Sequence, residues 1–228
     1  MSKRPPRKPP FSAADLIPDR PTIPKVRDAA AECKACPLWK RGTQTVFGEG
    51  RQGSVIMFVG EQPGDQEDLA GRPFVGPAGR ELDRALEEAG IDRAAVYVSN
   101  VVKHFKWEPR GKRRIHKKPN ASEIAACRPW LETEIALVKP SALVCLGATA
   151  AQALLGSGFK VSAQRGERVD SPLAPIVTAT IHPSAILRAP DDAARKEERR
   201  RLVEDLRKVK AYLGRMGKSG PRPALPVR

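Results

Sequence analysis

The sequence has no apolar run long enough to span a bilayer, and its first residues contain no apolar core of the signal-peptide type. We therefore expect no membrane partner and a cytoplasmic, nucleoid-associated protein. Internal repeats are also lacking, so a repeat architecture is not expected. Cysteine is scarce, with four residues in 228. Structural disulfides are not expected in a cytoplasmic chain.

Acidic residues are too few to balance the basic ones: 26 Asp and Glu stand against 41 Lys and Arg, which gives a formal net charge of +15. The centre of the chain stays basic after both basic ends are set aside. A polyanionic partner such as DNA or RNA is the natural expectation. The alternative is a protein whose charge serves only solubility.

Proline alternates with lysine and arginine in residues 1–24, which predicts a disordered basic leader. Residues 215–228 have the same character and are predicted to form a disordered basic tail. Between them, residues 25–214 are enough for one domain with a substantial core. We expect this domain to be a monomer.

Four short, apolar, β-rich runs alternate with helical stretches. The runs are residues 55–59, 95–101, 142–146 and 176–180, and the helical stretches are residues 77–89, 122–138, 149–155 and 193–213. This alternation predicts an α/β fold, a three-layer α/β/α sandwich with a central four-stranded, mostly parallel sheet. Parallel strands bring the segments that follow them to one edge of the sheet. Those segments are residues 60–65, Asn100, residues 147–149 and residues 182–184.

Residues 59–80 carry four acidic residues and five glycines directly after the first apolar run. Glycines at such a turn allow backbone amides to approach a ligand. A solvated turn before the next helix is the alternative. Because three other polar segments are predicted at the same edge, we interpret this segment as part of a functional site.

Cys33 and Cys36 form a Cys-x-x-Cys pair, and Cys127 and Cys145 complete a set of four. Four thiolates bind either zinc or a [4Fe–4S] cluster, and the spacing does not choose between them. The alternative is that Cys127 and Cys145 are buried apolar residues, since Cys145 lies within a predicted strand.

Several motifs occur together with these cysteines. They are Gly60-Glu61-Gln62-Pro63-Gly64, Gly71-Arg72-Pro73-Phe74-Val75-Gly76, Ser99-Asn100-Val101-Val102-Lys103 and His182-Pro183-Ser184. The set, which spans Cys33 to Leu213, resembles the family 4 uracil-DNA glycosylases. Within that family, Gln62 and the stretch Lys112-Arg113-Arg114-Ile115-His116 resemble the UdgX branch. The resemblance implies the fold of those enzymes, a [4Fe–4S] cluster on the four cysteines, and uracil-containing DNA as substrate. It leaves open whether double-stranded DNA is used besides single-stranded DNA.

The resemblance also implies roles for residues around the base. Asn100 would read the uracil edge, because a carboxamide both donates and accepts hydrogen bonds. Phe74 would stack on the flipped base, and Gln62 is a further uracil-binding residue. His182 would stabilise negative charge on the leaving uracil, and Glu61 would lie near the cation-like sugar. Ser184 and Arg188 are the residues expected to bind a DNA phosphate.

Residues 103–118 contain eight Lys and Arg against the single acid Glu108, with two aromatic residues between them. This composition predicts a loop that contacts nucleic acid, with Lys112, Arg113 and Arg114 as its DNA-binding residues. Asp65 and Asp68 are expected to shape their own loop or to pair with Arg113 or Arg114.

The UdgX resemblance makes His116 the residue that attacks the sugar C1′ and remains linked to the DNA. A nearby carboxylate polarises an imidazole, which is a second role for Glu61. One alternative is a family 4 enzyme that hydrolyses the bond and releases abasic DNA. The other is a non-catalytic iron–sulfur protein that only binds DNA.

Overall fold

The computed structural model describes residues 12–218. Its centre is a sheet of four strands, which are Ile56–Gly60 (β1), Val96–Asn100 (β2), Ala142–Leu146 (β5) and Ile176–Thr180 (β6). Their order is β2-β1-β5-β6, and every neighbouring pair is parallel. All residues of the four strands are buried, as expected where helices cover both faces of a parallel sheet. The predicted fold is confirmed, with strand bounds that differ by at most one residue.

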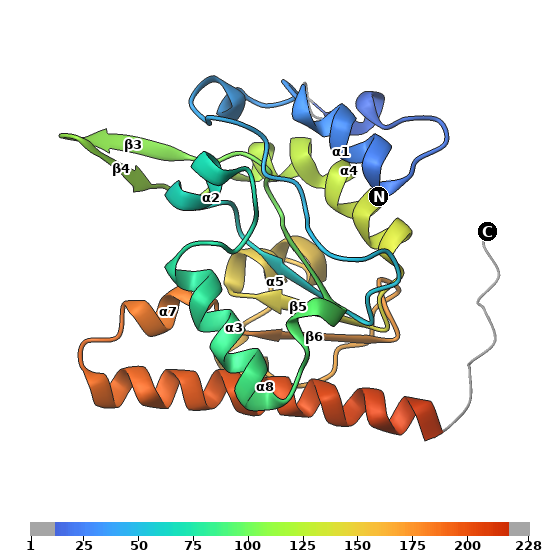
Figure 1. Ribbon diagram of the computed structural model, residues 1–228, viewed down its shortest axis with the longest axis vertical. Coiled ribbons are helices and arrows are strands. Elements are labelled where there is room, and N and C mark those ends of the chain that lie inside the picture. The colour runs from blue at the N-terminus through green and yellow to red at the C-terminus, as the bar shows by residue number, and fades with distance from the viewer. Residues whose placement is uncertain (1–11, 219–228) are drawn as a thin grey trace, which may run out of the picture.

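Helices form a layer on each side of this sheet (Figure 1). One layer contains Ile23–Ala31 (α1), Ala121–Val138 (α4) and Ala148–Leu155 (α5), and the other contains Pro77–Ala89 (α3), Ser184–Leu187 (α7) and Asp192–Lys218 (α8). Alternate strand residues supply two separate cores. Met57 and Val59 face the first layer, whereas Ile56 and Phe58 face the second. The strand periodicity of two therefore produces the three-layer sandwich.

A β-hairpin projects from the body of the molecule beyond the first helical layer (Figure 1). Its strands are Trp107–Arg110 (β3) and Arg113–His116 (β4), paired antiparallel, with Gly111 in a left-handed conformation at the turn. The sequence predicted a loop here. Most side chains of its two strands are exposed and half are charged, so the hairpin lacks the apolar alternation that reveals a strand packed on a core.

Short helices complete the fold. They are Asp65–Ala70 (α2), Val161–Gln164 (α6), and the 3₁₀-helices Ala13–Leu16, Pro37–Lys40 and Arg93–Ala95. For residues 59–80 the alternative interpretation was a solvated turn, and α2 does not fit that description. Glu67 and Asp68 in this helix are buried. Within residues 12–218, no helix is long and apolar enough to cross a membrane.

Both predicted domain boundaries fall inside ordered structure. Residues 1–11 of the predicted leader and residues 219–228 of the predicted tail lie outside the described residues. Ala13 and Ile23, however, are buried in the core beneath α4, so the packed chain begins before residue 25. At the other end, α8 continues to Lys218 because Leu213 and Met216 extend its apolar stripe against the second core.

Candidate nucleic-acid and base-binding site

The segments that follow the four parallel strands meet at one edge of the sheet, as the sequence predicted. Gly60, at the end of β1, is the close-packed centre of this edge. A Cβ at this position would lie 2.5 Å from Asn100 Oδ1, 2.8 Å from Phe74 Cζ and 3.5 Å from His182 Nε2. Only glycine leaves these three groups their positions, so the backbone of Gly60 lies at the centre of this cluster.

Asn100 ends β2 and is buried. Its backbone carbonyl accepts a hydrogen bond from Lys103 Nζ at 2.8 Å. Among residues 12–218, no group hydrogen-bonds its carboxamide, which leaves that amide for a ligand. An amide placed in this way can donate and accept along the edge of a pyrimidine.

Phe74 is buried, and its ring lies 6.2 Å from the His182 ring at an interplanar angle of 30°. Its backbone has φ = 57°, a conformation that non-glycine residues rarely adopt. Gly79 in α3 allows this conformation, because a Cβ there would lie 1.7 Å from the Phe74 carbonyl oxygen. Strained backbone of this kind is concentrated at functional sites. No sequence pattern indicates this role of Gly79.

His182 follows β6 and has a defined tautomer. The Ser184 backbone N–H donates to His182 Nδ1 at 3.2 Å, so Nδ1 is an acceptor and the proton of the neutral ring lies on Nε2. The Ser184 hydroxyl lies 2.8 Å from Nδ1 and accepts a hydrogen bond from Arg188 at 3.0 Å. Burial lowers the pKa of His182 to about 4, partly opposed by Glu61. At physiological pH, a neutral N–H donor therefore lies near Gly60, beside Asn100 and Phe74.

Glu61 and His116 come together although they are 55 positions apart in the chain. His116 Nε2 lies 3.2 Å from Glu61 Oε1, and Thr149, at the start of α5, donates to the other carboxylate oxygen. Burial raises the pKa of Glu61, but the hydrogen bonds from His116 and Thr149 outweigh it and hold the carboxyl below its usual pKa. His116 itself is half exposed. An ionised carboxylate thus lies next to an accessible imidazole, as predicted, while Thr149 is a new member of the site.

Arg114 fixes the hairpin to α2. Its guanidinium pairs with Asp65 at 2.5 Å and Asp68 at 2.6 Å, and it lies over the rings of Phe105 and Trp107. The sequence left the partner of the two acids open between Arg113 and Arg114, and the structure selects Arg114. Because these contacts occupy the guanidinium, Arg114 keeps the hairpin in place and does not offer a free guanidinium to a DNA phosphate.

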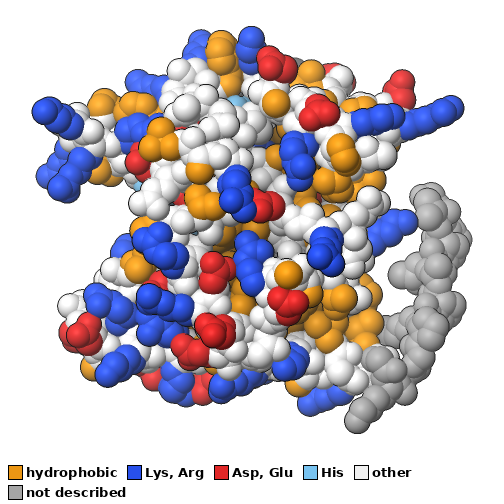
Figure 2. All heavy atoms as spheres, viewed as in Figure 1, with side chains coloured by type: hydrophobic (Ala, Val, Ile, Leu, Met, Phe, Trp, Pro, Cys, Tyr) orange, Lys and Arg blue, Asp and Glu red, His pale blue; other side chains and the backbone are white. Residues whose placement is uncertain are grey.

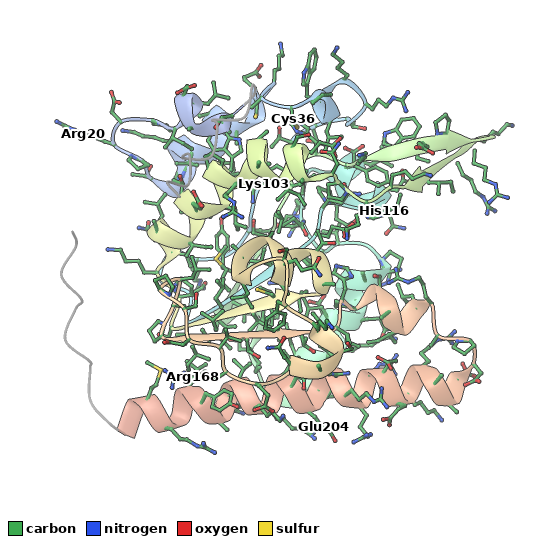
Figure 3. The ribbon with its side chains drawn as sticks, turned by 180° about the vertical axis from the view of Figure 1, so that it is seen from behind. Arg20, Cys36, Lys103, His116, Arg168 and Glu204 are labelled. Carbon is green, nitrogen blue, oxygen red and sulfur yellow. The ribbon has the colours of Figure 1, made fainter. Side chains whose placement is uncertain are left out.

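Lys112 and Arg113 lie at the exposed end of the hairpin. In Figure 2, blue side chains gather at the projecting end on the left of the molecule. In Figure 3, His116 lies at the base of the hairpin, close to the body of the protein. The hairpin therefore carries its free positive charge at its tip and its imidazole at the sheet edge.

Gln62 contacts the two chain segments where the hairpin joins the body of the protein. The resemblance instead implied that Gln62 binds uracil. Its amide nitrogen donates to the carbonyls of Lys106 at 3.2 Å and Lys117 at 3.0 Å, and its oxygen accepts from the Lys106 N–H at 3.1 Å. Lys106 and Lys117 flank the two strands. Gln62 thus joins both ends of the hairpin to the segment that carries Glu61.

Glu67, which the sequence did not single out, organises the glycine-rich segment. Its carboxylate accepts from the backbone N–H of Gly64 at 3.1 Å and of Gly76 at 2.7 Å. A Cβ at either glycine would lie within 3 Å of this carboxylate. The buried Glu67 therefore keeps the loops before and after Phe74 in place.

The four cysteines are reduced and buried in the core beneath α4. Cys127 is the closest to the Cys-x-x-Cys pair. Burial, with smaller contributions from the nearby Cys36 and Cys33, raises the pKa of Cys127 to about 12, partly opposed by Lys103. The Lys103 N–H donates to Cys127 Sγ at 3.3 Å, and Trp130 donates to Cys33 Sγ at 3.3 Å.

Cys145 is set apart from the other three thiols. It lies inside β5 between Val59 of β1 and Ala179 of β6, and burial alone raises its pKa, to about 12. Among the described residues, no three His, Cys, Asp or Glu side chains are positioned together to hold a metal ion. The thiols as arranged here do not form a complete four-cysteine site.

Comparisons with known proteins agree with this geometry. The family model described as the uracil DNA glycosylase superfamily matches residues 47–207. A type-4 uracil-DNA glycosylase of Thermotoga maritima is 40% identical over 194 residues, which cover 84% of this chain and 95% of the relative. The type-4 enzyme of Pyrobaculum aerophilum is 37% identical, with 74% and 86% covered, and that of Sulfurisphaera tokodaii is 35% identical, with 83% and 84% covered.

Proposed function

Because this chain belongs to the type-4 uracil-DNA glycosylases of the uracil DNA glycosylase superfamily, we propose that it removes uracil from DNA and then remains covalently attached to the sugar through His116. Uracil-containing DNA is the substrate, and base-excision repair is the process. The observation that carries the covalent step is the 3.2 Å contact between His116 Nε2 and Glu61 Oε1 at the edge of the base pocket. The Lys112–His116 motif supports placement in the UdgX branch.

The base must first leave the stack and enter the pocket, because its glycosidic bond is not accessible in stacked DNA. Asn100 recognises the pyrimidine edge with its free carboxamide, and Phe74 stacks on the ring. His182 donates its Nε2 proton to a uracil carbonyl oxygen. Ser184 and Arg188, which lie beside His182, bind the adjoining phosphate.

The bond between C1′ and the base nitrogen then breaks, and its electron pair leaves with uracil. Negative charge on the uracil oxygen is stabilised by the His182 N–H, and positive charge on the sugar by the Glu61 carboxylate. A lone pair of the His116 imidazole forms the new bond to C1′. Glu61 accepts the proton that the ring loses, so charge and atoms balance.

A denaturing gel with labelled, uracil-containing single-stranded DNA tests this proposal. We expect a heat-resistant shifted band with the unchanged protein, no such band with His116→Ala, and an unchanged band with Lys117→Ala, the exposed neighbour. A strand that breaks only after alkali treatment would identify a hydrolytic enzyme and overturn the covalent step. An intact strand in every lane would overturn uracil removal and favour a DNA-binding protein without catalysis.

We also propose that Cys33, Cys36, Cys127 and Cys145 hold a [4Fe–4S] cluster in the loaded protein. This proposal is supported by the burial of four free thiols in one core, with a Cys-x-x-Cys pair among them. Ligation requires Cys145 to join the other three, and no step above depends on the cluster. Iron and acid-labile sulfide analysis of the same preparations would show about four of each per chain, whereas zinc in their place would overturn this assignment.

A further inference from the structure

A buried ion pair lies directly behind the base pocket. Lys103 is 1% exposed and Glu134 is 0% exposed. In Figure 3, Lys103 lies in the interior of the protein beside α4. Its ammonium donates to the Glu134 carboxylate, to Ser99 Oγ at 2.6 Å and to the Asn100 carbonyl oxygen at 2.8 Å. All three donors of the lysine are therefore used.

The Glu134 carboxylate completes this network from α4. One of its oxygens accepts from Tyr97 at 2.9 Å and from the Gly48 N–H at 3.0 Å, and the other accepts from Ser99 at 2.8 Å besides Lys103. Burial and the adjacent carboxylate raise the pKa of Tyr97, so its hydroxyl remains a donor. The network thus binds the side chains of Tyr97 and Ser99 and the backbone of Asn100, the last residue of β2.

Asn100 is the residue of the candidate site that this network contacts. Its carboxamide has no hydrogen-bond partner among residues 12–218, so the position of its backbone and its close packing against Gly60 hold it in place. Beyond Asn100, the N–H of Val101 bonds to the Gly60 carbonyl at 2.9 Å, and the Asn100 carbonyl turns to Lys103. Lys103 therefore fixes the backbone of Asn100, whose carboxamide is placed to read the base edge.

Stability alone does not explain a buried Lys–Glu pair. Removing two charges from water is costly, and replacing such a pair by uncharged residues of similar volume is often neutral or stabilising. The Phe47 ring lies 5.6 Å from Lys103 Nζ, so an aromatic face also borders the ammonium. A role in the site is the more economical explanation.

We propose that Lys103 and Glu134 are positioning residues for base recognition, because they fix the Asn100 backbone so that its carboxamide meets the uracil edge. The inference rests on the proposed function. Neither residue touches the base. Both act through Asn100, and the consequence is a measurable coupling between the ion pair and this single side chain.

The test is a double-mutant cycle that measures free uracil released in a single turnover at saturating protein. The paired variant K103M/E134Q removes both charges together, so that no unpaired buried charge remains. We expect it to slow uracil release by about 10- to 100-fold, with a similar melting temperature. In the Asn100→Ala background, the same paired change should slow release by less than about 3-fold, because the group that the pair positions is already gone.

A matched control is the pair Arg199 and Glu81, which joins α8 to α3 in the other core. The variant R199M/E81Q should leave the release rate unchanged. Should K103M/E134Q not fold, Ser99→Ala removes one partner of both charged groups, and a smaller loss of rate should again vanish with Asn100→Ala.

The outcomes separate the two proposals. Equal losses in both backgrounds mean a general structural role and overturn the positioning proposal, while the proposed function stands. Full activity of K103M/E134Q overturns it as well. If the unchanged protein releases no uracil, the proposed function and the positioning proposal both fail.

Discussion

His182 illustrates how local contacts prepare a single side chain for its chemistry. Two groups of Ser184 lie against Nδ1, so the proton is on Nε2, and burial keeps the ring neutral. A neutral donor does not repel the positive charge that develops on the sugar. It still stabilises the negative charge on the leaving base.

This burial has a consequence for stability against pH. In the unfolded chain His182 titrates near pH 6.5, whereas its folded pKa is about 4. Between these values the unfolded state binds a proton that the folded state does not, so the free energy of unfolding falls as the pH is lowered through this window. We expect His182→Gln to remove this contribution and to flatten the pH dependence by at most about 1.4 kcal/mol per pH unit.

Urea titrations of both proteins at several pH values between 4 and 7 measure the difference. The comparison cancels carboxylates that titrate in the same range, as well as the buried His104, whose pKa burial also lowers. Parallel stability curves for the two proteins would contradict a buried, neutral His182.

Among the elements, the β3–β4 hairpin depends most on a few polar contacts. Gln62 bonds both of its ends, and Arg114 fixes its second strand to α2. His116 therefore stands on a projection whose position is set from the Glu61 segment rather than by a core of its own.

Replacing Gln62 by alanine should loosen the hairpin and slow the covalent step. Three part-buried hydrogen bonds are lost, each worth about 0.5–1.5 kcal/mol, and the backbone groups of Lys106 and Lys117 lose their partner. We expect faster amide exchange at residues 106–117 and adduct formation about 10-fold slower or more, with uracil release less affected. Exchange measured by mass spectrometry, beside gel-based adduct rates, checks both effects.

Gln152→Ala is the matched control, because this glutamine bonds a single backbone carbonyl, that of Phe159, away from the hairpin. It should leave exchange in the hairpin unchanged. An adduct rate that Gln62→Ala leaves intact would mean that the other contacts of the hairpin, those of Arg114 and Trp107 among them, are enough to position His116.

These elements also show what the sequence could predict. The four strands and α3 were found because their apolar runs are buried and Gly90 ends the helix in a left-handed conformation. The hairpin was missed because an exposed, charged ribbon has no apolar pattern, and α2 because its glycine-rich, acidic segment was interpreted as a turn. The family resemblance assigned Gln62 to uracil binding. No sequence pattern reveals its long-range hydrogen bond to Lys117.

Over the whole molecule, the net charge of +15 is less informative than its distribution. Along α8, arginines are paired with glutamates, as Arg200 is with Glu197 and Glu204. At the tip of the hairpin, Lys112 and Arg113 are exposed on the same element that carries His116. Phosphate contacts should therefore depend on the hairpin, and the charge of α8 should contribute little.

Salt dependence separates local from total charge. On a uracil-free single strand, which permits binding without excision, the logarithm of affinity falls with the logarithm of salt by about 0.7 per phosphate neutralised. We expect Lys112→Ala and Arg113→Ala each to lower this slope by about that amount, and Arg200→Ala, with the same change in net charge, to leave it unchanged. Fluorescence anisotropy across a series of salt concentrations provides the slopes. If all three variants lower the slope equally, DNA responds to the total charge of the protein, and the hairpin has no special place in phosphate binding.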